Sequence, residues 1–208
     1  MRKLMVTTFV TLDGVMQGPG GPDEDRDGGF EHGGWTVPHF DEHLMRVMAA
    51  IVDRGAALLL GRRTYDVFAA SWPLAQADDP IGAKLNSMPK YVASRTLDSV
   101  TWQHSTLLTG DAAKAVAELK RGEGGEIQVH GSGDLVQTLI EHDLVDEFHL
   151  LVFPVLLGSG KRLFARGTIP AGLRLTGSTT SGRGVIVATY ERAGAVGYGA
   201  MGPETGNW

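Results

Sequence analysis

The sequence contains no cysteine among its 208 residues, so disulfide bonds, zinc–thiolate sites and thiol catalysis are excluded. It also contains no run of about 18 apolar residues, and we therefore expect no membrane-spanning helix. Basic residues are outnumbered, because 24 acids stand against 19 lysines and arginines and the net charge is −5. Nucleic-acid-binding surfaces are usually basic, so we expect no nucleic-acid partner. Residues 1–4 lead into an alternating segment instead of an apolar signal segment, which favours a cytoplasmic location.

The remaining composition is typical of a globular protein, with 42% hydrophobic and 21% charged residues. The length fits one domain, which we expect over residues 1–192. Residues 193–208 form a glycine-rich tail, for which Trp208 is a candidate anchor. Residues 17–34 form a long loop rich in glycine and acids, and a loop of that length in a compact domain usually has a function or is mobile.

Hydrophobic periodicity predicts strands that alternate with helices. Residues 3–12 alternate with apolar side chains on both faces, and residues 56–60 are apolar throughout, as in buried strands. Residues 38–53 carry one apolar stripe and predict the clearest helix, with Pro38 in its first turn. A second helix is expected from Asp111, as its N-cap, to about residue 121. The order of elements, which ends with a hairpin over residues 173–190, predicts a mostly parallel α/β sheet with an antiparallel edge.

Two glycine turns lie where a predicted strand passes into a predicted helix, at residues 61–64 (GRRT) and 130–133 (HGSG). Glycine lets the backbone turn sharply and leaves bare amides at the start of the helix. Such a start attracts a phosphate group. A tight turn needs glycine without any ligand as well, so each turn alone is weak support for a phosphate site.

Further segments accompany these turns in a fixed order: VTLDG at 10–14, LGRRTY at 60–65, KYVASR at 90–95, HGSG at 130–133, LVDE at 144–147 and PVLLGSG at 154–160. Together they resemble the dihydrofolate reductase-like family over about residues 2–191. The closer match is the branch related to the reductase domain of bacterial riboflavin biosynthesis (the RibD C-terminal domain). The resemblance implies a single-domain fold of about eight strands, an NADPH cofactor and a homodimer.

The resemblance also implies the residues that bind NADPH. They are Gly61, Arg62, Arg63 and Thr64 for the phosphates, Ser94 and Arg95 for the 2′-phosphate, and Gly131, Ser132, Gly133 and Asp134 for the pyrophosphate. Arginine forks and exposed amides suit phosphate oxygens. Taken singly, Arg62 and Arg95 fit ordinary surface arginines better, and the ordered set of motifs favours the cofactor interpretation instead.

Asp13 and Asp41 are the candidate catalytic residues. Asp13 lies near the expected nicotinamide end, where it could orient substrate or relay a proton, or it could form an Asx-type turn before Gly14. Folate-reducing members have an acid early in their second helix. The acid of the similar segment here, Asp41, lies one position later and could face away from the pocket.

Trp35, Gly158 and Gly160 are the candidate substrate-binding residues. Trp35 could stack on a flat ring or cover the core beside Pro38. His39 and His43 have a spacing that can bind metal, but a solvated helix face explains them better, and we expect no metal site. We interpret His130 as a partly buried, hydrogen-bonded histidine.

These features predict an NADPH-dependent reductase that transfers hydride to a C=O or C=N carbon of a small heterocycle. The resemblance makes a pteridine or a pyrimidine of the riboflavin pathway the leading substrate class. No segment with the zinc ligands of a deaminase is present, so only the reductase half is expected. The alternative is a nucleotide- or flavin-binding protein on the same fold without turnover.

Overall fold

The computed structural model describes residues 1–76, 78–164, 168–202 and 204–205, so Trp208 lies outside the described residues. Its strands are β1 (Leu4–Thr11), β2 (Gly55–Gly61), β3 (Lys90–Ala93), β4 (Ser105–Leu108), β5 (Glu126–His130), β6 (Glu147–Phe153), β7 (Leu173–Thr180) and β8 (Ile186–Arg192). Its α-helices are α1 (Glu42–Arg54), α2 (Arg62–Ser71), α3 (Pro80–Ser87), α4 (Ala112–Arg121) and α5 (Gly133–Glu141). Three short 3₁₀ turns are η1 (Asp27–Gly29), η2 (Val37–His39) and η3 (Trp72–Leu74).

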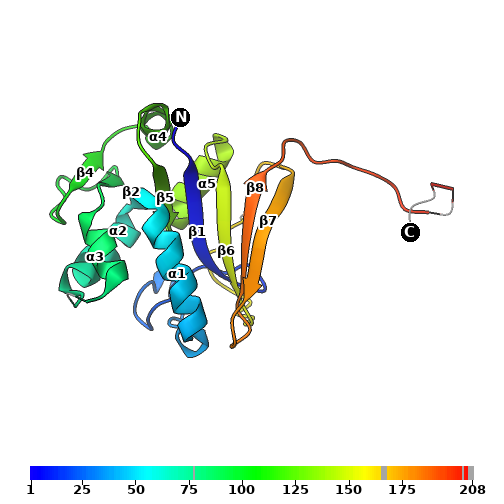
Figure 1. Ribbon diagram of the computed structural model, residues 1–208, viewed down its shortest axis with the longest axis horizontal. Coiled ribbons are helices and arrows are strands. Elements are labelled where there is room, and N and C mark those ends of the chain that lie inside the picture. The colour runs from blue at the N-terminus through cyan, green and yellow to red at the C-terminus, as the bar shows by residue number, and fades with distance from the viewer. Residues whose placement is uncertain (77, 165–167, 203, 206–208) are drawn as a thin grey trace.

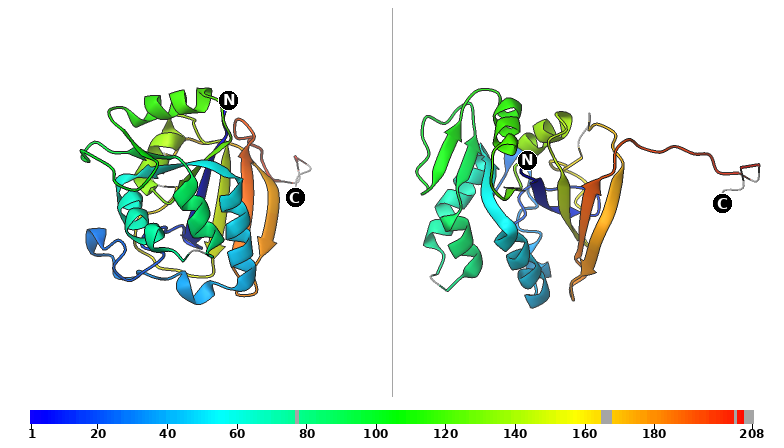
Figure 2. Two further views of the ribbon diagram at one scale, coloured as in Figure 1. Left: turned by 60° about the vertical axis from the view of Figure 1, so that its left-hand side comes forward. Right: turned by 45° about the horizontal axis from the view of Figure 1, so that its top comes forward.

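All eight strands form one sheet in the order β4-β3-β2-β5-β1-β6-β8-β7 (Figure 1). Strands β1 to β6 pair in parallel, whereas β8 pairs antiparallel with both β6 and β7. The prediction of a mostly parallel sheet with an antiparallel C-terminal edge is therefore confirmed. Beyond β8 the chain extends away from the body, as Figure 1 and the right-hand view of Figure 2 show.

Helices cover both faces of the sheet, with α1 in front of it and α5 behind it in Figure 1. One apolar cluster joins β1 and β5 to α5 through residues such as Val6, Val129 and Val136. On the other face, Val52 of α1 packs with Leu58 of β2 and with residues of α2 and α3. Since β1 leads to α1 and its neighbour β5 leads to α5, the chain leaves adjacent strands toward opposite faces. Ligands of open α/β sheets bind outside the strand ends at such a switch point.

The start of α1 differs from the prediction. The helix begins at Glu42, because Asp41 is extended and its carboxylate accepts a hydrogen bond from Leu44 N at 2.8 Å, as an N-cap does. Pro38 lies in η2 instead, and Phe40 is extended between the turn and the helix. The prediction that Pro38 lies in the first turn of this helix was therefore wrong. Within the part of the chain that the structure describes, no helix has the length and apolarity to cross a membrane.

Candidate active site

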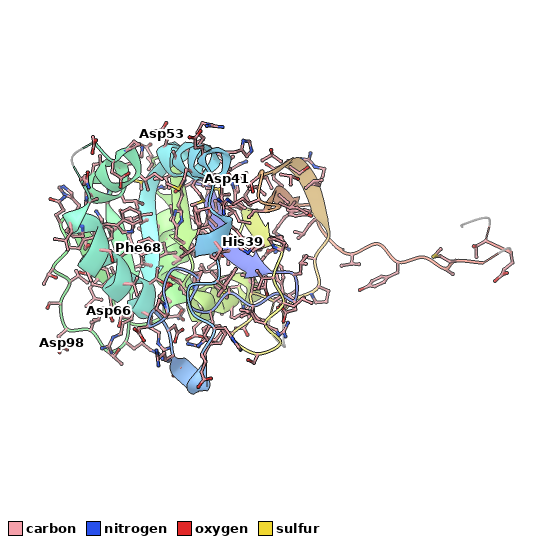
Figure 3. The ribbon with its side chains drawn as sticks, turned by 90° about the horizontal axis from the view of Figure 1, so that it is seen from below. His39, Asp41, Asp53, Asp66, Phe68 and Asp98 are labelled. Atoms are coloured by element: carbon pink, nitrogen blue, oxygen red, sulfur yellow. The ribbon has the colours of Figure 1, made fainter. Side chains whose placement is uncertain are left out.

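A cavity of about 1240 Å³ opens where β1, β2, β3 and β5 end. One part, here called the rim, consists of residues 61–64 at the start of α2, residues 94–96 after β3, and residues 131–134 at the start of α5. Another set of lining residues, here called the apolar end, consists of Thr7, Phe9, Phe40, Met45, Met48, Val52, Val67, Phe68, Ser71, Trp72, Ile81, Leu85 and His130. Figure 3 views the molecule from the side at which β1 ends and shows Phe68 on α2.

The two helices that begin at the rim have uncapped N-termini. Asp41, Asp79 and Asp111 each cap their helix with a side-chain oxygen. By contrast, α2 follows Gly61 and α5 follows Ser132, and neither residue makes a side-chain cap. Their first-turn amides are therefore open to a ligand, and an anion there also gains from the helix dipole. Of the five described α-helices, the two without a side-chain N-cap are thus α2 and α5, which begin at the rim of the cavity.

The two glycine turns are tied to one another. Ser132 Oγ accepts a hydrogen bond from Gly61 N at 3.0 Å, and Thr64 Oγ1 accepts one from Ser132 N at 3.0 Å. Gly131 and Ser132 both have left-handed backbones, with φ of 59° and 58°. A Cβ on Gly61 would lie 3.5 Å from Ser132 Cβ, so the turns pack closely. The Thr64 and Ser132 hydroxyls therefore position the rim by binding the amides of Ser132 and Gly61, and the first-turn amides of α2 and α5 remain open to a ligand.

The three predicted arginines differ in their partners. Arg95 is exposed and makes no hydrogen bond or ion pair with the described residues. Arg62 donates to Thr96 Oγ1 at 2.7 Å. Ser94 Oγ accepts from the amides of Thr96 and Leu97, both at 3.1 Å, so it shapes the turn that carries Arg95. Arg95 is thus the arginine of the rim most available to a ligand.

Arg63 is occupied by the loop of residues 17–34. Its guanidinium lies 3.0 Å from Asp25 and 2.9 Å from Asp27, and Lys161 lies 2.8 and 3.0 Å from the same two carboxylates. Hydrogen bonds from Arg63 and then Lys161 lower the pKa of Asp27 to about 2. Gln17 further donates to the carbonyls of both aspartates. The loop is therefore a fixed wall of the cavity, held by charge pairs between segments far apart in the sequence.

The carboxylate of Asp13 is hydrogen-bonded to neighbouring protein groups, and Asp13 is not among the residues that line the cavity. It accepts hydrogen bonds from Thr11 Oγ1 at 2.6 Å, Leu157 N at 3.2 Å and Gly158 N at 2.8 Å, with Arg162 at 3.4 Å. The bond from Thr11 is the main cause that lowers the pKa of Asp13 to about 2. The geometry favours the turn-forming interpretation, and a catalytic role stays a prediction.

Asp41 also lies outside the cavity lining, at the start of α1 (Figure 3). Besides capping that helix it accepts from Arg183 N at 3.1 Å, so its two oxygens hold α1 to the hairpin of β7 and β8. The hydrogen bond from Leu44 is the first cause that lowers the pKa of Asp41. These contacts agree with the expectation that Asp41 faces away from the pocket.

The predicted substrate residues Trp35 and Gly160 are packed in the protein. Trp35 is 8% exposed, donates from Nε1 to Gln17 O at 2.8 Å and meets Phe153 edge-on. A Cβ on Gly160 would lie 2.7 Å from Val15, so glycine is needed there for packing. Like Gly158, neither residue lines the cavity. The structure thus favours the core interpretation of Trp35, and contact with substrate stays a prediction for all three.

Apart from His130, the residues of the apolar end were not predicted from the sequence as site residues. Aromatic and thioether side chains such as Phe9, Phe40, Met48 and Phe68 are only partly buried, because they face the cavity. His130 lies among them, with its ring 6.4 Å from that of Phe68. Apolar side chains left open inside a cavity bind apolar ligand surface. The i, i+4 spacing of Phe40, Leu44 and Met48 was visible in the sequence, but it could not separate core from cavity.

His39 and His43, at metal-ligand spacing, point to different partners. His43 Nε2 lies 3.2 Å from Thr179 Oγ1, and the His39 ring lies 6.0 Å from that of Phe153. Within the described ranges, no group of three histidine or acidic side chains is arranged to hold a metal ion.

The family described as the RibD C-terminal domain matches residues 2–187 of this chain. The chain belongs to that family. Among curated proteins, the uncharacterised protein YyaP of Bacillus subtilis is 28% identical over 194 residues, which cover 91% of this chain and 94% of YyaP.

Two solved structures show the fold of this RibD C-terminal domain in other proteins. A candidate riboflavin biosynthesis protein of Shewanella sp. PV-4 has a TM-score of 0.67 and 22% identity, over 91% of this chain and 98% of that one. The dihydrofolate reductase of Enterococcus faecalis, complexed with NADP(H), has a TM-score of 0.58 and 11% identity, over 92% and 96%. The predicted family and the dihydrofolate reductase-like fold are both confirmed.

Proposed function

We propose that this RibD C-terminal domain is an NADPH-dependent reductase of a small heterocyclic compound, with a pteridine or a riboflavin-pathway pyrimidine as the leading substrate class. The family is one of NADPH-dependent pyrimidine and folate reductases. The observation that supports the proposal best is that one cavity is lined both by the rim and by the apolar end. A rim of arginines and bare amides suits a phosphorylated cofactor, and the apolar end beside it suits a flat ring.

The rim fits NADPH by its donors. The open amides at the starts of α2 and α5 suit the pyrophosphate, and Arg95 suits a 2′-phosphate because it is exposed and has no described partner. Arg62 can bind the same phosphate, because it is hydrogen-bonded to Thr96, the residue that follows Arg95. NADPH, when bound, supplies the hydride. The chain's own part is to hold the substrate ring at the apolar end and to exclude water there.

One observation favours the rival, a nucleotide- or flavin-binding protein without turnover. Asp13 and Asp41, the two predicted proton-placing carboxylates, are both occupied by hydrogen bonds away from the cavity. A reductase of this design would then take its proton from water or from another group. The rival needs no proton donor at all.

Thermal stability with NADPH, NADH and FMN in parallel tests the proposal first. A ligand at about 100 times its dissociation constant adds about 2.7 kcal/mol of stability. We expect a larger shift with NADPH than with NADH, followed by NADPH oxidation with at least one pterin or pyrimidine. A shift with FMN alone would favour the rival, and no shift with any nucleotide would contradict both.

We also propose a cytoplasmic homodimer. Exposed apolar side chains on the edge hairpin support a protein contact there, with Leu173, Leu175 and Ile186 between 40% and 51% exposed. Light scattering of the purified chain distinguishes a dimer of twice 22.2 kDa from a monomer.

A further inference from the structure

His130 is the ionisable side chain of the apolar end. Of the described residues that line the cavity, the other ionisable ones lie in the rim or in the loop of residues 17–34, or are Lys161 and Asp111. His130 is 7% exposed and lies against Phe68. Its neighbour in register on β1 is Thr7, whose buried hydroxyl has no hydrogen-bond partner among the described residues. His130 and Thr7 are therefore two polar residues in a lining that is mostly apolar.

A chain of hydrogen bonds fixes which ring nitrogen of His130 carries the proton. The Gln128 side-chain nitrogen donates to Ile51 O at 2.6 Å and to Glu126 Oε1 at 2.9 Å, and the backbone carbonyl of Ile51 can only accept. The Gln128 carbonyl oxygen is therefore the atom 3.1 Å from His130 Nε2, and Nε2 must donate to it. Gly55 makes room for this amide, since a Cβ there would lie 2.7 Å from Gln128 Cδ.

With its proton on Nε2, neutral His130 has an unprotonated nitrogen at Nδ1. No hydrogen bond links Nδ1 to any residue within the described ranges. Burial, with His149 as a second cause, lowers the pKa of His130 to about 4. At neutral pH Nδ1 is thus a hydrogen-bond acceptor, and a ligand that fills the apolar end must offer it a donor or leave it unpaired.

Charge selects the ligand as well. The apolar end offers an anion no lysine or arginine, and it offers a cation no carboxylate, because Asp41 is turned to the hairpin. An ion there would be desolvated without a partner, which costs far more than burying a neutral ring. The same end offers several ring faces, such as Phe9 and Phe68, to a flat molecule.

We propose that the apolar end binds an uncharged ring that donates an N–H or O–H hydrogen bond to His130 Nδ1, so that His130 selects the substrate and anionic rings are rejected. This inference rests on the proposed function and narrows its substrate class from heterocycles in general to neutral heterocycles with a donor at one edge.

Calorimetric binding of matched rings to the full chain without cofactor at pH 6.5 tests the inference. Lumazine has N–H donors, and 1,3-dimethyllumazine has none. We expect lumazine to bind about tenfold more tightly than 1,3-dimethyllumazine, and uncharged 6-methylpterin to bind at least tenfold more tightly than pterin-6-carboxylate. His130→Leu should remove the lumazine preference, whereas His130→Asn, whose Oδ1 can replace Nδ1 as acceptor, should keep part of it.

His142→Leu is the matched control, because His142 is exposed at the end of α5 and bonds only to the carbonyl of Thr138 among described residues. It should bind all four rings as the unmodified chain does. Equal affinity for both lumazines, a preference that survives in His130→Leu, equal binding of the carboxylate, or no lumazine binding would each overturn the inference. The comparison of rings on the unmodified chain needs no variant, so it can refute the inference even if His130→Leu does not fold. Failure of NADPH to bind would overturn the proposed function separately, since these measurements contain no cofactor.

Discussion

The buried, neutral His130 makes the stability of this protein depend on pH in a defined window. Its pKa falls from 6.5 in an unfolded chain to about 4 in the folded protein, mainly through burial. Below pH 6.5 His130 becomes protonated in the unfolded chain, whereas in the folded protein it stays neutral down to about pH 4. The free energy of unfolding therefore falls as the pH falls through this window, and above pH 6.5 the histidine has no effect.

The magnitude follows from the size of the shift. Each pKa unit corresponds to about 1.4 kcal/mol, so the full window is worth about 3 kcal/mol and the step from pH 6.5 to pH 5 about 2 kcal/mol. Urea unfolding followed by tryptophan fluorescence at pH 7, 6 and 5 measures the loss. His130→Gln is the comparison, because its amide can still donate to Gln128 but cannot take up a proton.

Other groups also change their pKa on folding, including Glu147, where burial opposes the shift but the hydrogen bond from His149 and the nearby Arg54 lower the pKa. They act in both proteins, so the difference between them isolates His130. We expect the unmodified chain to lose about 2 kcal/mol more than His130→Gln between pH 7 and pH 5. Parallel losses in the two proteins would refute the claim that His130 is buried in its neutral form.

Three further predictions concern the rim and the support of His130. Arg95→Ala should weaken NADPH at least tenfold and NADH less than threefold by calorimetry, since a charged hydrogen bond to the 2′-phosphate is lost; equal losses would contradict the assignment. Asp27→Asn should tighten NADPH about two- to fivefold at low salt, because it removes one of the two carboxylates that hold Arg63, and the gain should vanish at high salt. Gly55→Ala should lower the unfolding free energy by about 1–3 kcal/mol through overpacking. Gly177→Ala, with open space at its Cβ, should change it by less than about 0.5 kcal/mol.

The sequence could predict the elements that depend on local pattern. Alternation in β1 and the apolar run of β2 were enough for a parallel sheet, and Asp111 marked the start of α4 as an N-cap. The start of α1 was misplaced because Pro38 and Asp41 are both acceptable first-turn signals. Only the packing of Asp41 against the hairpin decides between them.

The site was predictable where it depends on glycine and not where it depends on pairing. The turn at Gly131 shows in the sequence, because its left-handed backbone favours glycine, whereas Gly61 has an extended backbone that does not require glycine. The contact of Arg63 with Asp25 joins residues 38 positions apart, and no local pattern signals it. The hydrogen bonds of Asp13 could not be predicted for the same reason, because its carboxylate accepts from amides of a segment more than 140 positions away.

The positions of Asp41 and His130 suggest how this cavity differs from one built around a carboxylate. Asp41 is bound to α1 and the hairpin, so a positively charged or protonated ring finds no anionic partner at the apolar end. On β5, which lines the cavity, the hydrogen-bond chain from Glu126 through Gln128 presents a neutral acceptor at His130. A neutral acceptor can orient a ring through an N–H donor. With a pKa of about 4, however, His130 is almost entirely neutral at neutral pH and is a poor source of the proton that a reduction needs. If turnover occurs, the ring is therefore positioned by His130 and protonated from elsewhere, and the rate should not follow the titration of this histidine above pH 6.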